Sequence, residues 1–82
     1  MRQQIPVCTE AQLHQGESFD WINSGTTECH IKKCDPPLEQ NHYVVPAGGK
    51  TPAKVRDGAE KKSHEYCCEC GKTKTNPHII IS

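Results

Sequence analysis

The chain has few of the residues with which a globular domain stabilises itself by burial alone. Among its 82 residues only four are aromatic, and a third are hydrophobic. A domain of this length buries only about 60% of the surface that its unfolded chain exposes. We therefore expect a small core whose stability depends partly on covalent or metal crosslinks. No repeat, linker or second unit interrupts the chain, so residues 1–82 are expected to form one domain.

Long apolar runs and an excess of charge are also lacking. The longest apolar run is Ile79–Ile81, far shorter than the roughly 20 residues of a membrane-spanning helix. Ten basic residues balance ten acidic ones, and the basic residues are scattered along the chain. Nucleic-acid binders instead concentrate positive charge on one surface. We therefore expect no membrane span and no nucleic-acid partner, but a monomer that is free to bind an unidentified protein.

Cysteine is plentiful by contrast. The six cysteines form an even set in a short, polar chain: Cys8, Cys29, Cys34, Cys67, Cys68 and Cys70. Such a set is typical of disulfides in an oxidising compartment, or of thiolate ligands to a metal. The disulfide interpretation predicts an extracytoplasmic protein, periplasmic or secreted, whose leader has been removed. The metal interpretation is also compatible with the cytoplasm.

Short strands separated by turns are the predicted local structure. Turn-forming residues recur at short intervals, and no window keeps the spacing of an amphipathic helix. The clearest strand is 19–23, because alternation sends Phe19 and Trp21 to one face and Asp20 to the other. Further strands are expected at 43–45, 53–55, 64–70 and 79–81, with a possible edge strand at 5–9 that contains Pro6. This pattern predicts an all-β, largely antiparallel sandwich or barrel.

Four segments, taken in order, resemble the cupredoxin-like domains of small blue copper proteins. Residues 14–23, which read HQGESFDWIN, resemble the family's Gly-Asp-x-apolar-x-Trp-x-Asn hairpin. Residues 43–49 resemble its middle strand and glycine-containing turn, residues 65–70 its Tyr-x-Cys-x-x-His copper loop, and residues 79–81 its closing strand. The resemblance implies a small Greek-key β-sandwich in which the two strands that carry the copper ligands are neighbours.

The expected copper ligands are incomplete. Cys68 falls on the copper cysteine of the resemblance, but Gly71 stands where the loop histidine would be. Cys29 or His30 falls near the position of the first histidine. A blue copper site needs two imidazoles, a thiolate and usually a weak thioether, and the chain has no methionine beyond Met1. We therefore expect a cupredoxin-like module that is not a conventional blue copper electron carrier.

Alternation within residues 66–70 separates the clustered cysteines into two sets. A straight strand puts Tyr66, Cys68 and Cys70 on one face and Cys67 on the other. Cys68 and Cys70 then lie about 6.6 Å apart along the strand with parallel Cβ vectors, which disfavours a bond between them. Each is expected to face a partner across the sheet, and Tyr66 is expected in the core.

Two chemistries follow from the implied topology, in which Cys29 and Cys34 are the partners across the sheet. In the first, a zinc or copper ion is bound by ligands drawn from Cys29, His30, Cys34, Cys68 and Cys70. In the second, the same cysteines form cross-strand disulfides, and Cys8 reaches Cys67 on the opposite face. Both alternatives stay open at this point.

A third interpretation is a zinc ribbon. Residues 67–72 also resemble a Cys-x-x-Cys-Gly-Lys zinc knuckle, with Cys29 and Cys34 as the first pair. That first pair is followed by Asp-Pro-Pro at 35–37, not by the glycine turn that a knuckle prefers.

Catalysis is not expected. No oxyanion turn or glycine-rich phosphate loop lies near the cysteines, so we expect no enzyme activity. His14 and His42, beside turn residues, are expected to be solvated. His64 is expected on the inward face, because an even number of positions separates it from Tyr66 and Cys68.

Overall fold

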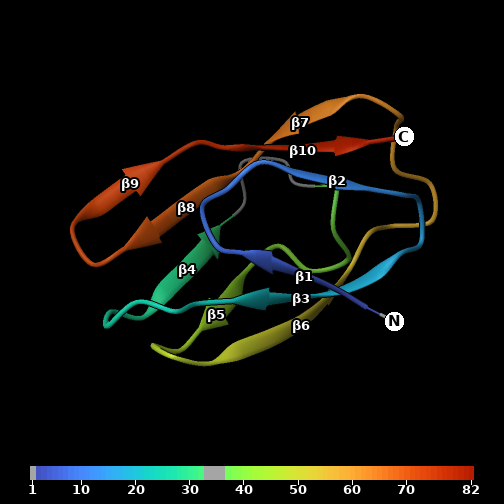
Figure 1. Ribbon diagram of the computed structural model, residues 1–82. Coiled ribbons are helices and arrows are strands. Elements are labelled where there is room, and N and C mark those ends of the chain that lie inside the picture. The colour runs from blue at the N-terminus through green and yellow to red at the C-terminus, as the bar shows by residue number, and fades with distance from the viewer. Residues whose placement is uncertain (1, 33–36) are drawn as a thin grey trace.

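The computed structural model describes residues 2–32 and 37–82. Within these residues the chain forms strands and no helix (Figure 1), so the prediction of an all-β protein is confirmed. The described part accordingly contains no helix that could cross a membrane. The strands are β1 (Gln3–Pro6), β2 (Ala11–Leu13), β3 (Ser18–Ile22), β4 (Cys29–Lys32), β5 (Tyr43–Val45), β6 (Lys50–Lys54), β7 (Ser63–Glu65), β8 (Cys67–Cys70), β9 (Thr73–Thr75) and β10 (His78–Ile81).

The strands form three small sheets. Their orders are β1-β3-β6, β2-β10-β7 and β5-β4-β8-β9. In Figure 1 the first two sheets lie opposite each other, and the four-stranded sheet occupies the end of the molecule away from both termini. Two pairings are parallel, β1 with β3 and β2 with β10, and the described others are antiparallel. The arrangement is compatible with a β-sandwich, and β1 is an edge strand, as Pro6 predicts. The strand is 3–6 and not the predicted 5–9, because the chain turns at residues 7–9.

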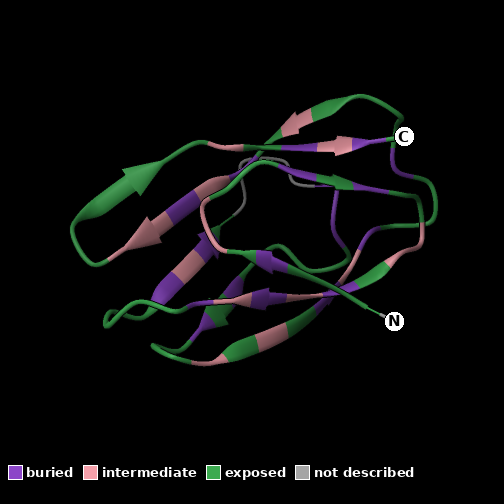
Figure 2. Ribbon diagram, viewed as in Figure 1, coloured by how far each residue is buried: buried purple, intermediate pink, exposed green. Residues whose placement is uncertain are grey.

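One hydrophobic core joins the inner faces of all three sheets. Burial alternates along most strands (Figure 2), as it does in β3, where Phe19 and Trp21 are fully buried. The Trp21 ring meets Phe19 edge-on at 5.1 Å between centroids and Tyr66 at 5.3 Å. The other core residues come from every sheet: Ile5, Ala11, Leu13, Ile31, Leu38, Tyr43, Val45, Ala53, Val55, Ala59, Cys68, Ile79 and Ile81. The aromatic contacts therefore lie at the centre of a shared core.

The segment 64–70, expected to be one strand, is two. β7 pairs with β10 in one sheet, while β8 pairs with β4 and β9 in another. Tyr66 lies between them, fully buried, and its backbone N–H donates to the carbonyl of Pro77 at 2.9 Å. The chain changes sheets at Tyr66, whose ring belongs to the core that both sheets share.

Three strands were not expected from alternation alone. β2, β4 and β9 have three or four residues each, too few to establish a period of two. β9 forms a hairpin with β8 through Gly71, whose φ of +62° is one that glycine adopts without strain. These strands depend on their pairing partners and not on local propensity.

Candidate functional site

Cys29 and Cys70 form a disulfide between neighbouring strands. They lie directly opposite each other in the antiparallel pairing of β4 with β8, and their Cα atoms are 4.2 Å apart. Cys29 is buried, as is Ile31 two residues later, so both point to the inner face. The expectation that Cys70 faces a partner across the sheet is confirmed, and Cys29 is that partner.

Cys8 and Cys68 form a second disulfide, with Cα atoms 5.4 Å apart. The predicted bond between Cys8 and Cys67 is therefore wrong, and so is the expectation that Cys68 bonds Cys29 or Cys34 across the sheet. Cys8 lies in the turn after β1, on the inner side of β8, and alternation aims the buried Cys68 to that side and Cys67 away from it. Cys67 is itself disulfide-bonded, and no cysteine in 2–32 or 37–82 is free.

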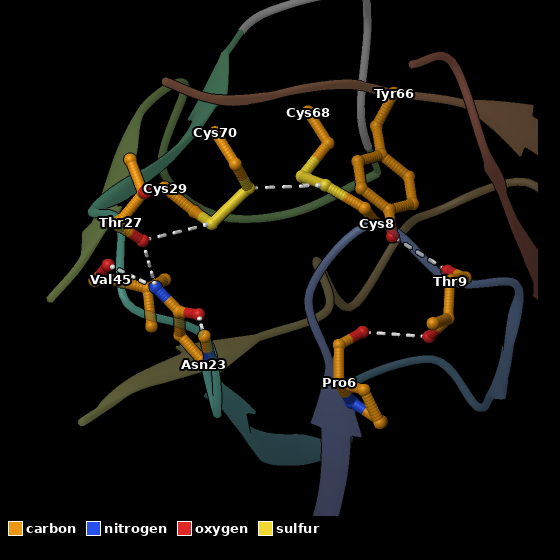
Figure 3. Close-up of a disulfide and its surroundings, with 11 residues drawn as sticks. Pro6, Cys8, Thr9, Asn23, Thr27, Cys29, Val45, Tyr66, Cys68 and Cys70 are labelled. Atoms are coloured by element: carbon orange, nitrogen blue, oxygen red, sulfur yellow. Dashed lines mark hydrogen bonds between the residues drawn. A yellow bond between two sulfur atoms is a disulfide. The ribbon is translucent and has the colours of Figure 1, made fainter. Parts of the chain in front are cut away.

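The turn that presents Cys8 is held in an unusual backbone conformation. Cys8 has a φ of +62°, which costs a residue with a side chain about 1–2 kcal/mol. Thr9 spans the turn, since its hydroxyl donates to the carbonyl of Pro6 and its own carbonyl accepts from the Tyr66 hydroxyl, each at 2.6 Å (Figure 3). The disulfide and these hydrogen bonds hold the strained turn against the core.

The two disulfides touch each other. The Sγ atoms of Cys8 and Cys70 are 3.5 Å apart, although they belong to different bonds. The Sγ atoms of Cys8, Cys68 and Cys70 all lie within 4.8 Å of one another, and Cys29 is bonded to Cys70. We call these four residues the sulfur cluster (Figure 3). It joins the first turn of the chain to both central strands of the four-stranded sheet.

An open concavity of about 300 Å³ exposes part of the sulfur cluster, and the loop after β3 forms much of its wall. Asn23, which is buried, shapes this loop. Its Nδ2 donates to the carbonyls of Thr27 at 2.8 Å and Val45 at 3.2 Å, and its Oδ1 accepts from the N–H of Gly25 at 3.0 Å. Every polar atom of this buried amide thus has a partner.

The structure brings together some of the predicted ligands and separates others. Cys29, Cys68 and Cys70 meet in the sulfur cluster, while Cys34 lies outside the described residues. His30 is on the outer face of β4, where its Nδ1 is 3.1 Å from Nε2 of His42. His30 therefore does not join the cysteines. His64 is half-buried, and its Nε2 contacts the carbonyl of Glu60 at 2.8 Å.

Two features of the site could not be found from spacing. Cys8 is 60 residues from its partner, and nothing near it in the sequence indicates which cysteine it meets. His42 lies next to His30 only because of the register between β4 and β5. The one nearby residue that helped to locate Cys8 is Pro6, because proline indicates an edge strand and that strand leads to Cys8.

Four described groups have shifted pKa values. Burial raises the pKa of Tyr66 and of Tyr43. A hydrogen bond from the Lys32 ammonium, with Nζ 2.9 Å from Oε2, lowers the pKa of Glu69, and one from Lys62 lowers the pKa of Glu60. Each of these four pKa values is therefore farther from pH 7 than the ordinary value of its side chain.

Comparison with known proteins does not place the chain in a family. No protein family model matches its sequence, and no curated protein matches it significantly.

Proposed function

We propose that the chain is a non-enzymatic, extracytoplasmic module with a cupredoxin-like β-sandwich fold, which uses its cysteines as structural crosslinks and acts by binding a protein partner. The sulfur cluster carries this proposal, because both of its cysteine pairs are disulfides. The cupredoxin-like assignment is supported by the pairing of β4 with β8. The resemblance implies that the strands with Cys29 and Cys68 are neighbours.

The crosslinks match the needs of a small core. The disulfides span 60 and 41 residues, and closing loops of this size in the unfolded chain is worth about 4 kcal/mol each in the entropic model. Small domains have a total stability of about 5–15 kcal/mol. The crosslinks therefore account for a large share of the stability, and such bonds persist mainly in oxidising compartments.

The titratable groups support a role without catalysis. General acids and bases work best with a pKa near the operating pH, and active sites shift their groups toward it. The shifted pKa values of Tyr43, Tyr66, Glu60 and Glu69 move the other way. None of these four groups is therefore placed to act as a general acid or base near neutral pH.

Mass spectrometry of the native protein tests the proposal. We expect a metal-free monomer whose mass is six hydrogens below that of the fully reduced chain, and loss of cooperative unfolding after a dithiol reductant is added. A native protein that carries free thiols and one bound metal ion per chain would overturn the assignment of the cysteines as crosslinks.

A second candidate function, metal binding by the reduced sulfur cluster, is favoured by the proximity of its sulfurs. Four thiolates around a zinc ion at 2.3 Å lie about 3.8 Å apart, close to the 3.5 Å between the Sγ atoms of Cys8 and Cys70. Two dithiol molecules would reduce both disulfides to four thiols, and Zn²⁺ would then displace their protons. If this is correct, Zn²⁺ restores the far-UV spectrum of the reduced chain; a reduced chain that stays unfolded with Zn²⁺ excludes it.

A further inference from the structure

A pair of histidines lies on the outer face of the four-stranded sheet. His30 is the second residue of β4 and points outward, because its neighbours Cys29 and Ile31 are buried. In the register of β4 with β5, Val44 lies opposite His30. His42 is two residues before Val44 and therefore diagonal to His30 on the same face, within reach of a ring. The sheet thus places two imidazoles together on the face opposite the sulfur cluster.

The two rings hold their nitrogens at a chelating distance. Nδ1 of His30 and Nε2 of His42 are 3.1 Å apart, and the rings are nearly parallel with centroids at 5.3 Å. Two nitrogens that bind one metal ion at 2.0–2.1 Å lie about 2.9 Å apart at a right angle and about 3.4 Å apart at a tetrahedral angle. The observed separation falls between these values.

A carboxylate lies near the first ring, on the side away from His42. Oε2 of Glu28 is 3.6 Å from Nε2 of His30, the nitrogen on the far side of the ring from His42. Metal-binding histidines typically direct their other N–H to a carboxylate or carbonyl, which fixes the tautomer and makes the ligand more basic. A proton on Nε2 leaves the lone pair of Nδ1 directed to the space shared with His42.

We propose that His30 and His42 form a two-imidazole site for a divalent late transition-metal ion, with water in the remaining positions. Imidazole suits zinc, nickel and copper, and a site of given ligands binds Cu²⁺ most tightly in this series. The His30 side chain is 35% exposed, and His42 is exposed, so an ion has access from solvent. The site needs no cysteine and is independent of the proposed crosslinking role.

Titration of the oxidised protein with Cu²⁺ or Zn²⁺ in a calorimeter tests the site, once its mass has confirmed that the thiols are bonded. We expect one ion per chain. His30→Ala and His42→Ala are each expected to weaken binding by more than about tenfold, the loss typical of removing a supporting group alone. For Cu²⁺, nitrogen coupling in the electron paramagnetic resonance spectrum should fall from two imidazoles to one.

His14→Ala and His78→Ala are the matched controls, because these two histidines are also exposed but lie apart from the pair. Their affinities should equal that of the unmodified protein. Unchanged binding in His30→Ala, or an equal loss in His14→Ala, would show that the 3.1 Å contact is only a hydrogen bond between imidazoles. Either result overturns the site and leaves the disulfide assignment untouched.

Discussion

Cys8 and Cys70 bring their Sγ atoms to 3.5 Å of each other while each is bonded to a different cysteine. A thiolate exchanges with a disulfide by attacking one of its sulfurs. Freeing either of these residues therefore places a nucleophile in contact with the remaining bond. The adjacency makes the pairing of the sulfur cluster open to rearrangement.

Cys68→Ala should produce a mixed disulfide pattern. The substitution leaves Cys8 as a thiol beside the Cys29–Cys70 bond, so attack on the Cys70 sulfur forms a Cys8–Cys70 bond and releases the Cys29 thiolate. Alkylation in acid followed by peptide mapping should find label on both Cys8 and Cys29. Label on Cys8 alone would show that exchange does not occur.

Removing the Cys8–Cys68 bond should destabilise the fold by about 3 kcal/mol, because the other crosslink already shortens the loop that it closes. Denaturant unfolding of Cys8→Ala/Cys68→Ala under oxidising conditions measures this loss.

The matched variant is Cys8→Gly/Cys68→Ala. It lacks the same bond but removes the cost of the +62° φ at position 8, so it should be about 1 kcal/mol more stable than the alanine version. Equal stabilities would contradict the strained turn.

Tyr66 should make the protein lose stability at alkaline pH. Burial raises the pKa of its hydroxyl above that in the unfolded chain. The stability that the neutral hydroxyl contributes is fully present below the unfolded-state pKa of about 10. It is lost as pH rises above that pKa, at up to about 1.4 kcal/mol per pH unit. Unfolding free energies between about pH 8 and pH 11 check the slope.

Tyr66→Phe supplies the control. It should cost about 1–2 kcal/mol at neutral pH, since the carbonyl of Thr9 loses its donor. Its stability should also fall less steeply above pH 10, with Tyr43 as the remaining buried tyrosine. An unchanged slope would assign the alkaline transition to other groups.

Gly16→Ala should destabilise the turn between β2 and β3. Gly16 has a φ of +73°, and an added Cβ would lie 2.7 Å from Oδ1 of Asp57. The Asp57 side chain is exposed and can move. The main cost is therefore that of holding alanine at a positive φ, about 1–2 kcal/mol. Gly58→Ala, with no positive φ and open space around its Cβ, should leave thermal stability unchanged or slightly raised.

Much of the strand pattern was predictable because it depends on neighbours in the sequence. Alternation around Phe19 and Trp21 identified β3 and its buried face, and Pro6 identified the edge strand. The division of segment 64–70 was not predictable. It depends on where Tyr66 meets Trp21 in the core, and no local pattern records that contact.

The candidate site, like the fold, was predictable from the sequence only in part. Alternation correctly put Cys68 and Cys70 on one face of β8 and Cys67 on the other. It did not determine that Cys8 bonds Cys68, because that choice depends on how the turn after β1 packs against β8. The placement of His30 beside His42 likewise required the register of β4 and β5.

The sequence by itself therefore determined an all-β chain rich in cysteine, since composition, turn residues and period-two alternation are local properties. Only the tertiary structure decided which sulfurs meet and which histidines adjoin. Those contacts join residues up to 62 positions apart, and they follow from packing and strand register rather than from any property of the residues taken singly.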